Sequence, residues 1–390
     1  MQKIKDELVF RLIIAVAIGL GLGLVVNESL MLIILTIRDV LSQIIFFTIP
    51  LIILGFVAPS IASLKSGATK LLSFAVTIAY LSTLGAAVFA MVAGYIIVPA
   101  LNIPDVATDL RALPELIFSL QITPIMSVMS ALALSLMLGV AVAVTGATTF
   151  EKLLNEFQAI VLKIVTSLII PILPVFICAT FARLAYQGTI TQQLPVFLVV
   201  ILIAIVGHFI WLAVLYGVAG IYSGQKPSEV YKNYAPAYFT AVGTMSSAAT
   251  LPVSLKCADK SRVLSKDSID FGIPLFANIH LCGSVLTEVF FVMTVSMVLY
   301  GSMPSVANMI VFVVLLGIFG IGAPGVPGGT VMASLGLITG VLGFDVEGTA
   351  LMMTIFALQD SFGTACNVTG DGALTLMLSK YMNKIESKNI

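Results

Sequence analysis

The stretch DSFGTACNVTGD, residues 360–371, decides how the rest of the chain is interpreted. Four of its polar residues are spaced four, three and four positions apart, namely Asp360, Thr364, Asn367 and Asp371. On a helix they form one polar stripe about 16 Å long. The flanking runs TALMMTIFAL and GALTLMLSKY are typical of lipid or an apolar core. An ionised aspartate there costs about 2.5–3.5 kcal/mol, which favours a site for cations, ligands or protons over a seam that only joins helices.

The composition is that of an integral membrane protein. Of its 390 residues 59% are hydrophobic and 10% are charged, whereas soluble domains carry about 25% charged residues. The net charge of zero gives no reason to expect nucleic acid as a partner. Two histidines and four cysteines without a paired spacing suggest neither a metal cluster nor a disulfide framework. Neither HExxH nor GxSxG occurs, so we expect no enzyme and no catalytic residues.

Hydrophobic runs predict six ordinary membrane spans, at about 9–26, 38–60, 71–99, 116–145, 157–184 and 194–221. The first run lacks a clean small-residue cleavage site, so we expect a retained helix, not a signal peptide. If the spans alternate in direction, most lysines fall on one side of the membrane. The positive-inside rule then places both termini in the cytoplasm.

Beyond residue 222 the hydrophobic pattern is interrupted twice. The segments 234–258 and 309–343 are apolar at both ends and broken in the middle by small residues and proline. Each half is too short to span a membrane, so the pattern predicts two re-entrant hairpins related as inverted repeats. Their tips must be buried in protein or line a cavity. Two kinked but ordinary helices are the alternative.

Both predicted tips have residues that suit a ligand. Ser246, Ser247 and Thr250 precede the expected start of a half-helix, with Pro252 in its first turn. The free N–H groups and positive dipole of such a start favour a carboxylate. At the other tip the run GVPGG, residues 325–329, leaves backbone groups open to a ligand. Close helix packing is the alternative role for these small residues.

Three motifs together resemble the glutamate transporter family, the dicarboxylate/amino acid:cation symporters. They are SSAATLP at 246–252, GVPGG at 325–329 and NVTGD at 367–371. The resemblance implies an all-α polytopic membrane protein with eight membrane helices and two re-entrant hairpins. It also implies a homotrimer in the plasma membrane, here a bacterial inner membrane, in which a transport domain moves as an elevator along a scaffold.

The resemblance divides the chain into these two domains. The expected scaffold holds helices one and two in residues 1–70 and helices four and five in residues 100–193. The expected transport domain holds the third helix at 71–99 and residues 194–390. Within the latter range we expect the sixth helix, a first hairpin at 234–258, a seventh helix at 268–300, a second hairpin at 309–343 and an eighth helix at 347–380.

The resemblance also implies roles for individual residues. The expected substrate is a small amino acid or organic acid, and Asp360 is expected to bind the amino group of an amino acid. The other expected substrate-binding residues are Ser246, Ser247, Val326, Gly329, Gly363, Thr364 and Asn367. The expected Na⁺ ligands are Asn278, Asn367 and Asp371. Na⁺, H⁺ or both are the expected coupling ions, with no other cofactor.

Gly363 departs from the family pattern, because members that select acidic substrates carry an arginine at that position. A buried second carboxylate without a partner is heavily penalised. We therefore expect a small neutral amino acid as substrate, with an acidic amino acid or a dicarboxylate as the alternative.

The expected seventh helix departs further. It reads HLCGS at residues 280–284, where the family usually has Asn-Met-Asp-Gly-Thr. Imidazole and thiol groups are poor ligands for Na⁺, so we expect a reduced or altered sodium dependence. Glu288 falls where proton-coupled members carry a glutamate, and His280 would lie on nearly the same helix face, so both are candidates for proton coupling. A packing hydrogen bond for Glu288 and a satisfied core histidine are the alternatives. At the level of the whole protein, an uncoupled exchanger or a channel is the alternative.

Overall fold

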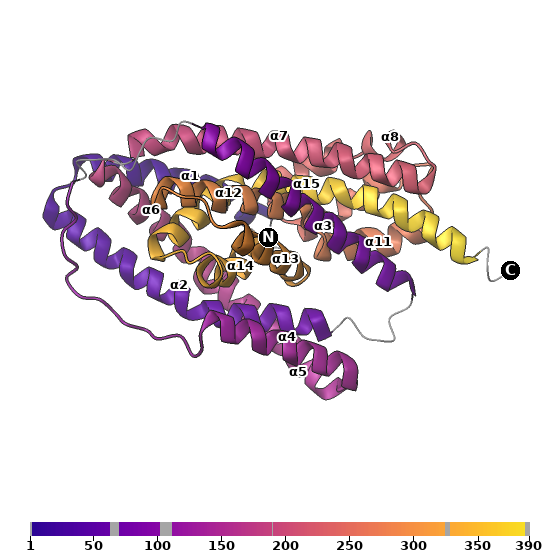
Figure 1. Ribbon diagram of the computed structural model, residues 1–390, viewed down its shortest axis with the longest axis horizontal. Coiled ribbons are helices and arrows are strands. Elements are labelled where there is room, and N and C mark those ends of the chain that lie inside the picture. The colour runs from indigo at the N-terminus through magenta and orange to yellow at the C-terminus, as the bar shows by residue number, and fades with distance from the viewer. Residues whose placement is uncertain (1, 63–69, 102–110, 189, 324–327, 387–390) are drawn as a thin grey trace.

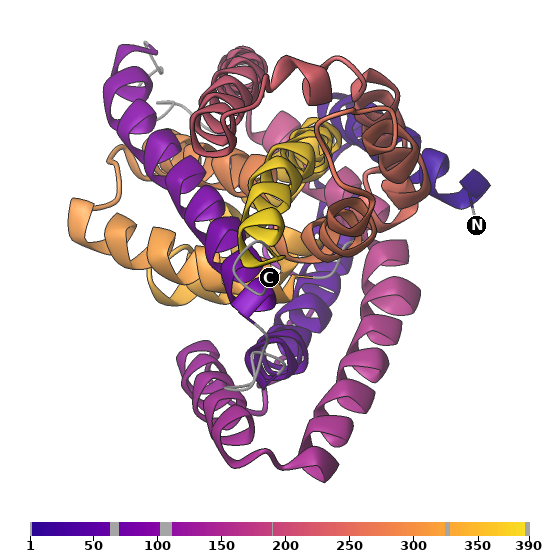
Figure 2. The same ribbon diagram turned by 90° about the vertical axis from the view of Figure 1, so that its right-hand side faces the viewer.

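Helices make up every regular element that the computed structural model describes, in residues 2–62, 70–101, 111–188, 190–323 and 328–386. One group contains α1 (Gln2–Val25), α2 (Glu28–Ala62), α4 (Val128–Thr145), α5 (Thr148–Ile164) and α6 (Ile170–Gln187). Here α1 packs along α6, and α2 packs on α4, α5 and α6. A π-helical turn, Val165–Ile169, joins α5 to α6. Figure 2 shows α4 and α5 at the lower end of the molecule, beside the end of α2.

The second group surrounds the long helix α15 (Val346–Glu386), which is drawn in yellow in Figure 1. Its members include α3 (Lys70–Ile97), α7 (Ile190–Ser223), α11 (Lys266–Ile279) and α12 (Cys282–Tyr300). α15 contacts α7, α11 and α12, and α3 packs on α12. Two short elements follow α3 and α7, at Val98–Ala100 (η1) and Ser228–Tyr231 (α8). The polar stripe of α15 is therefore enclosed by other helices.

Two pairs of short helices complete the molecule. The first is α9 (Ala235–Thr244) with α10 (Ser247–Ala258), and the second is α13 (Val306–Gly322) with α14 (Gly329–Gly340). The members of each pair contact each other. α9 also packs on α15, while α13 packs on α3 and α14 packs on α2 and α4. Both interrupted segments of the sequence are thus helix–break–helix units.

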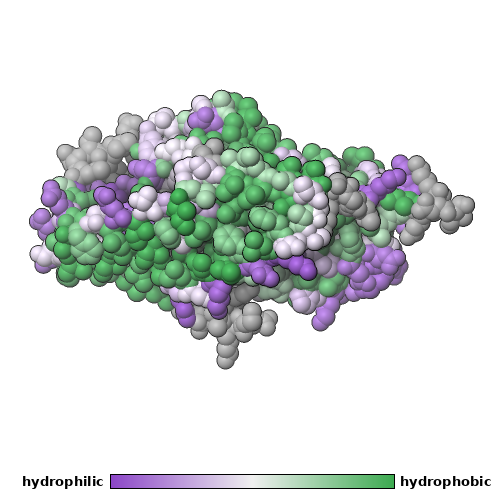
Figure 3. All heavy atoms as spheres, turned by 90° about the horizontal axis from the view of Figure 1, so that it is seen from below, coloured by the Kyte–Doolittle hydropathy of each residue, from purple (hydrophilic) through white to green (hydrophobic). Residues whose placement is uncertain are grey.

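Several helices are long and apolar enough to cross a membrane. Five described stretches meet that criterion: Glu28–Pro59, Lys70–Ala100, Thr148–Ile172, Val196–Ser223 and Lys266–Tyr300. Large apolar side chains lie on the outside, as Ile96 and Ile221 do with 70% and 88% exposure. Figure 3 shows hydrophobic residues over the middle of one face and hydrophilic residues toward both of its ends. This arrangement fits a molecule whose solvent is lipid.

Three predicted spans differ from the observed helices. The second begins at Glu28, ten residues before its predicted start at 38. The predicted span at 116–145 is helical only from Val128, because Ser127 caps α4 through Ser130 N and the residues before it, including Pro124, are not helical. The predicted seventh helix at 268–300 is two helices, since the chain leaves helical geometry at His280 and Leu281.

Candidate functional site

The four polar residues of the α15 stripe are all buried. Asp360, Thr364, Asn367 and Asp371 are 3%, 5%, 1% and 1% exposed. They lie on one continuous helix, as their spacing predicts. The stripe is surrounded by apolar core side chains, so every polar atom on it needs a partner within the protein or a ligand.

Asp360 meets the start of α14. The backbone N–H of Gly328 donates to Asp360 Oδ2 at 2.6 Å. Gly328 is the N-cap of α14, with a φ of 71° that glycine adopts without strain, and Gly329 is the first helical residue. The carboxylate therefore lies at the positive end of a helix dipole. Val326, which was predicted to bind substrate through its backbone, lies outside the described residues.

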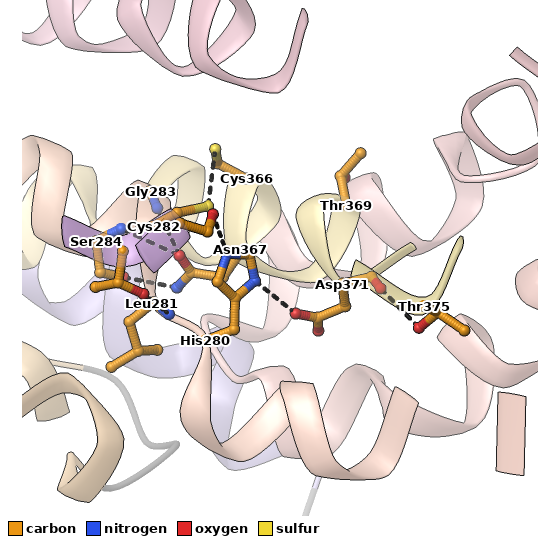
Figure 4. Close-up of polar contacts among 12 residues, drawn as sticks. His280, Leu281, Cys282, Gly283, Ser284, Cys366, Asn367, Thr369, Asp371 and Thr375 are labelled. Atoms are coloured by element: carbon orange, nitrogen blue, oxygen red, sulfur yellow. Dashed lines mark hydrogen bonds and ion pairs between the residues drawn. The ribbon is translucent and has the colours of Figure 1, made fainter. Parts of the chain in front are cut away.

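Asn367 caps the start of α12. Its Oδ1 accepts from the N–H groups of Gly283 and Ser284 at 2.7 and 3.2 Å, and its Nδ2 donates to Ser284 Oγ at 2.9 Å (Figure 4). These bonds satisfy donors that the first turn of a helix leaves without partners. Gly363 lies beside the same turn, because a Cβ atom there would be 3.1 Å from Ser284 Cα. The predicted selector position is thus also a close contact between two helices.

Asp371 is paired with His280. His280 Nδ1 lies 2.9 Å from Asp371 Oδ1, and the two side chains are 0% and 1% exposed. The other ring nitrogen, Nε2, lies 2.9 Å from Ser82 Oγ on α3. Figure 4 shows the imidazole directed from the α11–α12 break toward Asp371. Asp371, the expected Na⁺ ligand, and His280, the candidate for proton coupling, therefore contact each other.

Glu288 lies elsewhere, on α12. Its Oε1 accepts a hydrogen bond from Ser334 Oγ on α14, and its Oε2 has no hydrogen-bond partner within the described residues. The expectation that His280 and Glu288 share a helix face is wrong, because the break at His280 and Leu281 separates them. The side-chain hydrogen bonds of the two residues reach different helices. Those of His280 reach α3 and α15, and that of Glu288 reaches α14.

The first helix pair has its own polar turn. Ser246 is the N-cap of α10, and its side chain accepts from Ala249 N at 3.2 Å. Thr244 Oγ1 and Thr250 Oγ1 lie 2.9 Å apart across the turn. Ser247 is 4% exposed and begins α10, so the helix starts earlier than predicted. Thr250 lies within the helix, and Pro252 lies beyond its first turn.

The remaining sodium candidate, Asn278, lies apart from this network. It is exposed, and its Nδ2 donates to Pro274 O of its own helix at 2.7 Å. All four cysteines are free thiols, as expected from their spacing. Cys282 Sγ and Cys366 Sγ lie 4.0 Å apart behind Asn367. Among the described residues no cluster of histidine, cysteine and acidic side chains could hold a metal ion.

Sequence reasoning missed several partners of the site. Ser82 and Thr83 of α3 contact the helix break, Thr83 through a 3.4 Å bond from Leu281 N. Ser334 contacts Glu288, and His208 Nε2 lies 2.9 Å from Thr287 Oγ1. These residues are serines, threonines and a histidine. Their only signal in the sequence is that each is a polar residue within an apolar segment.

Comparison with known proteins agrees with the motifs. A family model described as "Sodium:dicarboxylate symporter family" matches residues 8–381. Human excitatory amino acid transporter 2 is 28% identical over 232 residues, which cover 56% of this chain and 39% of the relative. Human neutral amino acid transporter B(0) is 27% identical over 190 residues, which cover 48% of this chain and 35% of the relative.

A third relative is the putative sodium-dependent excitatory amino acid transporter glt-6 of Caenorhabditis elegans. It is 30% identical over 160 residues, which cover 41% of this chain and 29% of the relative. The chain thus spans less than half the length of these curated relatives. All three are named as transporters and not as enzymes, and the apolar helices indicate a multi-pass membrane protein. With a family model that matches nearly its whole length, the chain belongs to the sodium:dicarboxylate symporter family.

Proposed function

We propose that this chain is a secondary active transporter that carries a small amino acid across the membrane, coupled to a cation. The observation that carries the proposal is the polar stripe of α15, which meets the starts of two helices inside an apolar core. Helix starts suit a carboxylate, and the Asp360 carboxylate suits an ammonium group. An amino acid presents both groups. The relatives named as amino acid transporters support the same substrate class.

A substrate with a neutral side chain fits this site better than a substrate with an acidic side chain. Among the described residues Arg38 is the only buried lysine or arginine, and it donates to Thr180 on α6. A second substrate carboxylate at the α15 stripe would therefore lack a cationic partner there. The relatives include transporters named for neutral and for excitatory amino acids. An acidic amino acid or dicarboxylate symporter is thus the second candidate, and an uncoupled exchanger is the third.

For the mechanism we propose elevator movement within a homotrimer in a bacterial inner membrane, with both termini cytoplasmic. The group formed by α1, α2, α4, α5 and α6 would be the scaffold. The group around α15, with re-entrant pairs α9–α10 and α13–α14, would move. Contacts of α14 with α2 and α4 support this division, because they are contacts that such movement would exchange.

The coupling ion is proposed from the groups near the stripe that could bind Na⁺ or a proton. Asn278 and Asn367 fit Na⁺ poorly, because Asn278 is exposed and the Asn367 oxygen accepts two backbone N–H groups. Backbone carbonyls near Asn278 and the second helix pair are the remaining place for Na⁺. Glu288 is the proposed proton carrier. Its Oε2 has no hydrogen-bond partner among the described residues, and a proton there would relieve the cost of burying a charge. Sodium dependence is therefore proposed to be reduced or altered.

Two measurements test this function. Thermal stabilisation by a panel of amino acids and organic acids, each with and without Na⁺, reports ligand binding through the shift in the folding equilibrium. Alanine or serine should stabilise the protein more than aspartate does, and the reverse order would favour the acidic alternative. Transport in proteoliposomes under separate sodium and proton gradients tests coupling. Counterflow without any response to either gradient would indicate the exchanger.

Glu288→Gln tests the proton proposal separately. The variant keeps a group that accepts from Ser334 but cannot release a proton. We expect its transport to lose the response to an imposed proton gradient while substrate still stabilises the protein. An unchanged response would exclude Glu288 as the carrier.

A further inference from the structure

His280 is held by a site built from three helices. Its two ring nitrogens lie 2.9 Å from Asp371 Oδ1 on α15 and 2.9 Å from Ser82 Oγ on α3. The ring itself is completely buried. Because both nitrogens have partners, the imidazole has one defined orientation. Its position beside Asp371 is therefore a feature of the packed core.

The neighbouring backbone leaves room for this ring. A Cβ atom on Gly370 would lie 2.8 Å from His280 Cε1 and 3.3 Å from Cys282 Sγ. The break that carries His280 is bonded to α3 on one side, through Leu281 N and Thr83 Oγ1. It is bonded to α15 on the other side, through the Asn367 cap of α12. The break, the space at Gly370 and the two hydrogen bonds together place the imidazole against Asp371.

The chemistry of this contact makes Asp371 a poorer ligand for a metal ion, because the imidazole takes part of its acceptor capacity. With Asp371 ionised, its oxygens only accept hydrogen bonds, and His280 Nδ1 is then the donor of this bond. A nitrogen that carries a hydrogen offers no lone pair to a cation, and its N–H group takes up one lone pair of Oδ1. Two side chains of the same network, Asn367 and Cys282, do not supply a cation ligand in place of His280 Nδ1. Asn367 Oδ1 accepts two N–H groups, and the Cys282 thiol is a poor ligand for a hard cation.

We infer that His280 is a specificity-determining residue that takes the place of a metal cation at Asp371. The residues around Asp371 thus do not fit the sodium ion that the family description names. Any sodium that this protein uses binds without Asp371. The inference rests on the proposed function for its meaning in transport, but Na⁺ binding in the absence of substrate tests it independently.

The experiment compares wild type, Asp371→Asn, His280→Asn and the double variant. Thermal stability is titrated with NaCl against choline chloride at constant ionic strength, without substrate. Asp371→Asn keeps an oxygen that accepts from His280, so the contact survives. We expect the same sodium titration as wild type, within about twofold in the midpoint. If Asp371 binds sodium in the wild type, the substitution shifts that midpoint by about tenfold or more, which overturns the inference.

His280→Asn supplies the converse test. It frees Asp371 and adds an amide oxygen, so we expect a sodium-dependent rise in thermal stability that exceeds that of wild type. The added response should disappear in the double variant. His208→Asn is the matched control, because His208 is also completely buried but contacts Gly283 O and Thr287, and its sodium response should equal wild type. A His280→Asn response no larger than that of wild type overturns the inference.

The sodium titration and the measurement of amino acid binding or transport distinguish failure of this inference from failure of the proposed function. If His280→Asn does not fold, Asp371→Asn in the wild-type background still decides the question. If no amino acid binds or is transported, the proposed function fails while the sodium titrations retain their meaning.

Discussion

Asp360 and Asp371 are the same residue type on the same face of α15, yet their surroundings differ completely. Asp360 contacts the backbone N–H of Gly328 beside the second helix pair. Asp371 contacts the His280 side chain, which is itself held by Ser82. A backbone N–H at the start of a helix is a partner that a ligand can replace or share. We propose that the buried imidazole, which is bonded on both sides, is a fixed partner of Asp371 and that the contact of Asp360 is the one that changes.

The largest effect is expected from removing the fixed partner. His280→Ala leaves Asp371 buried with its main partner gone, and breaking a buried pair in this way costs about 3–5 kcal/mol of folding free energy. Thermal unfolding in detergent should show a large fall in the midpoint temperature. His208→Ala is the control and should lower it less, because it leaves no buried charge. Equal losses in the two variants would contradict the special role of His280.

The next largest effect is expected on substrate affinity when the charge of Asp360 is removed. Asp360→Asn keeps the shape of the side chain but removes its charge, and a hydrogen bond to a charged group contributes about 1.5–3 kcal/mol. Affinity for the amino acid should therefore fall by about tenfold or more, as measured by calorimetry or thermal stabilisation. Asp270→Asn is a control on the exposed face of α11, where Asp270 pairs with Lys266 at 3.0 Å. Undiminished affinity in Asp360→Asn would mean that Asp360 does not bind the ammonium group.

A smaller effect is expected at the cap between the two aspartates. Asn367→Ala removes the acceptor for Gly283 N and Ser284 N, and loss of a helix cap costs about 0.5–2 kcal/mol. Amide hydrogen exchange should become faster in the first turn of α12. Asn278→Ala should leave that turn unchanged, because Asn278 is exposed and bonds within α11. Unchanged exchange in Asn367→Ala would show that α12 does not depend on this cap.

The smallest effect is expected where the two helix groups meet through charges. Arg183 on α6 and Glu347 at the start of α15 lie 2.9 Å apart, with side chains 17% and 32% exposed. A partly exposed pair contributes less than about 1 kcal/mol. A double-mutant cycle with Arg183→Gln and Glu347→Gln measures the coupling in thermal stability. A coupling well above this value would make the ion pair a main link between α6 and α15.

Much of the architecture could be predicted because it follows from local patterns. The spacing in residues 360–371 predicted the buried stripe on α15, and small residues predicted the breaks in both interrupted segments. The helical content of 116–127 was wrongly predicted, because hydropathy counts apolar residues without weighing Pro124 and the cap at Ser127. Composition alone cannot separate an apolar helix from an apolar extended segment.

The contacts of the site could be predicted less well, because they join distant parts of the chain. The break at His280 and Leu281 contains neither glycine nor proline, and it is held by Thr83 and Asn367 from other helices. The partner of His280 is 91 residues away. A single sequence identified both residues as candidates but gave no reason to place them in contact.

Asp360 and Asp371 have different partners, and we propose different roles for them. The sodium dependence of alanine binding, compared between wild type and Asp371→Asn, tests this difference. We expect the same sodium dependence in both proteins, because His280 Nδ1 already contacts Asp371 Oδ1. A large rise in the sodium concentration that Asp371→Asn needs for binding would contradict it.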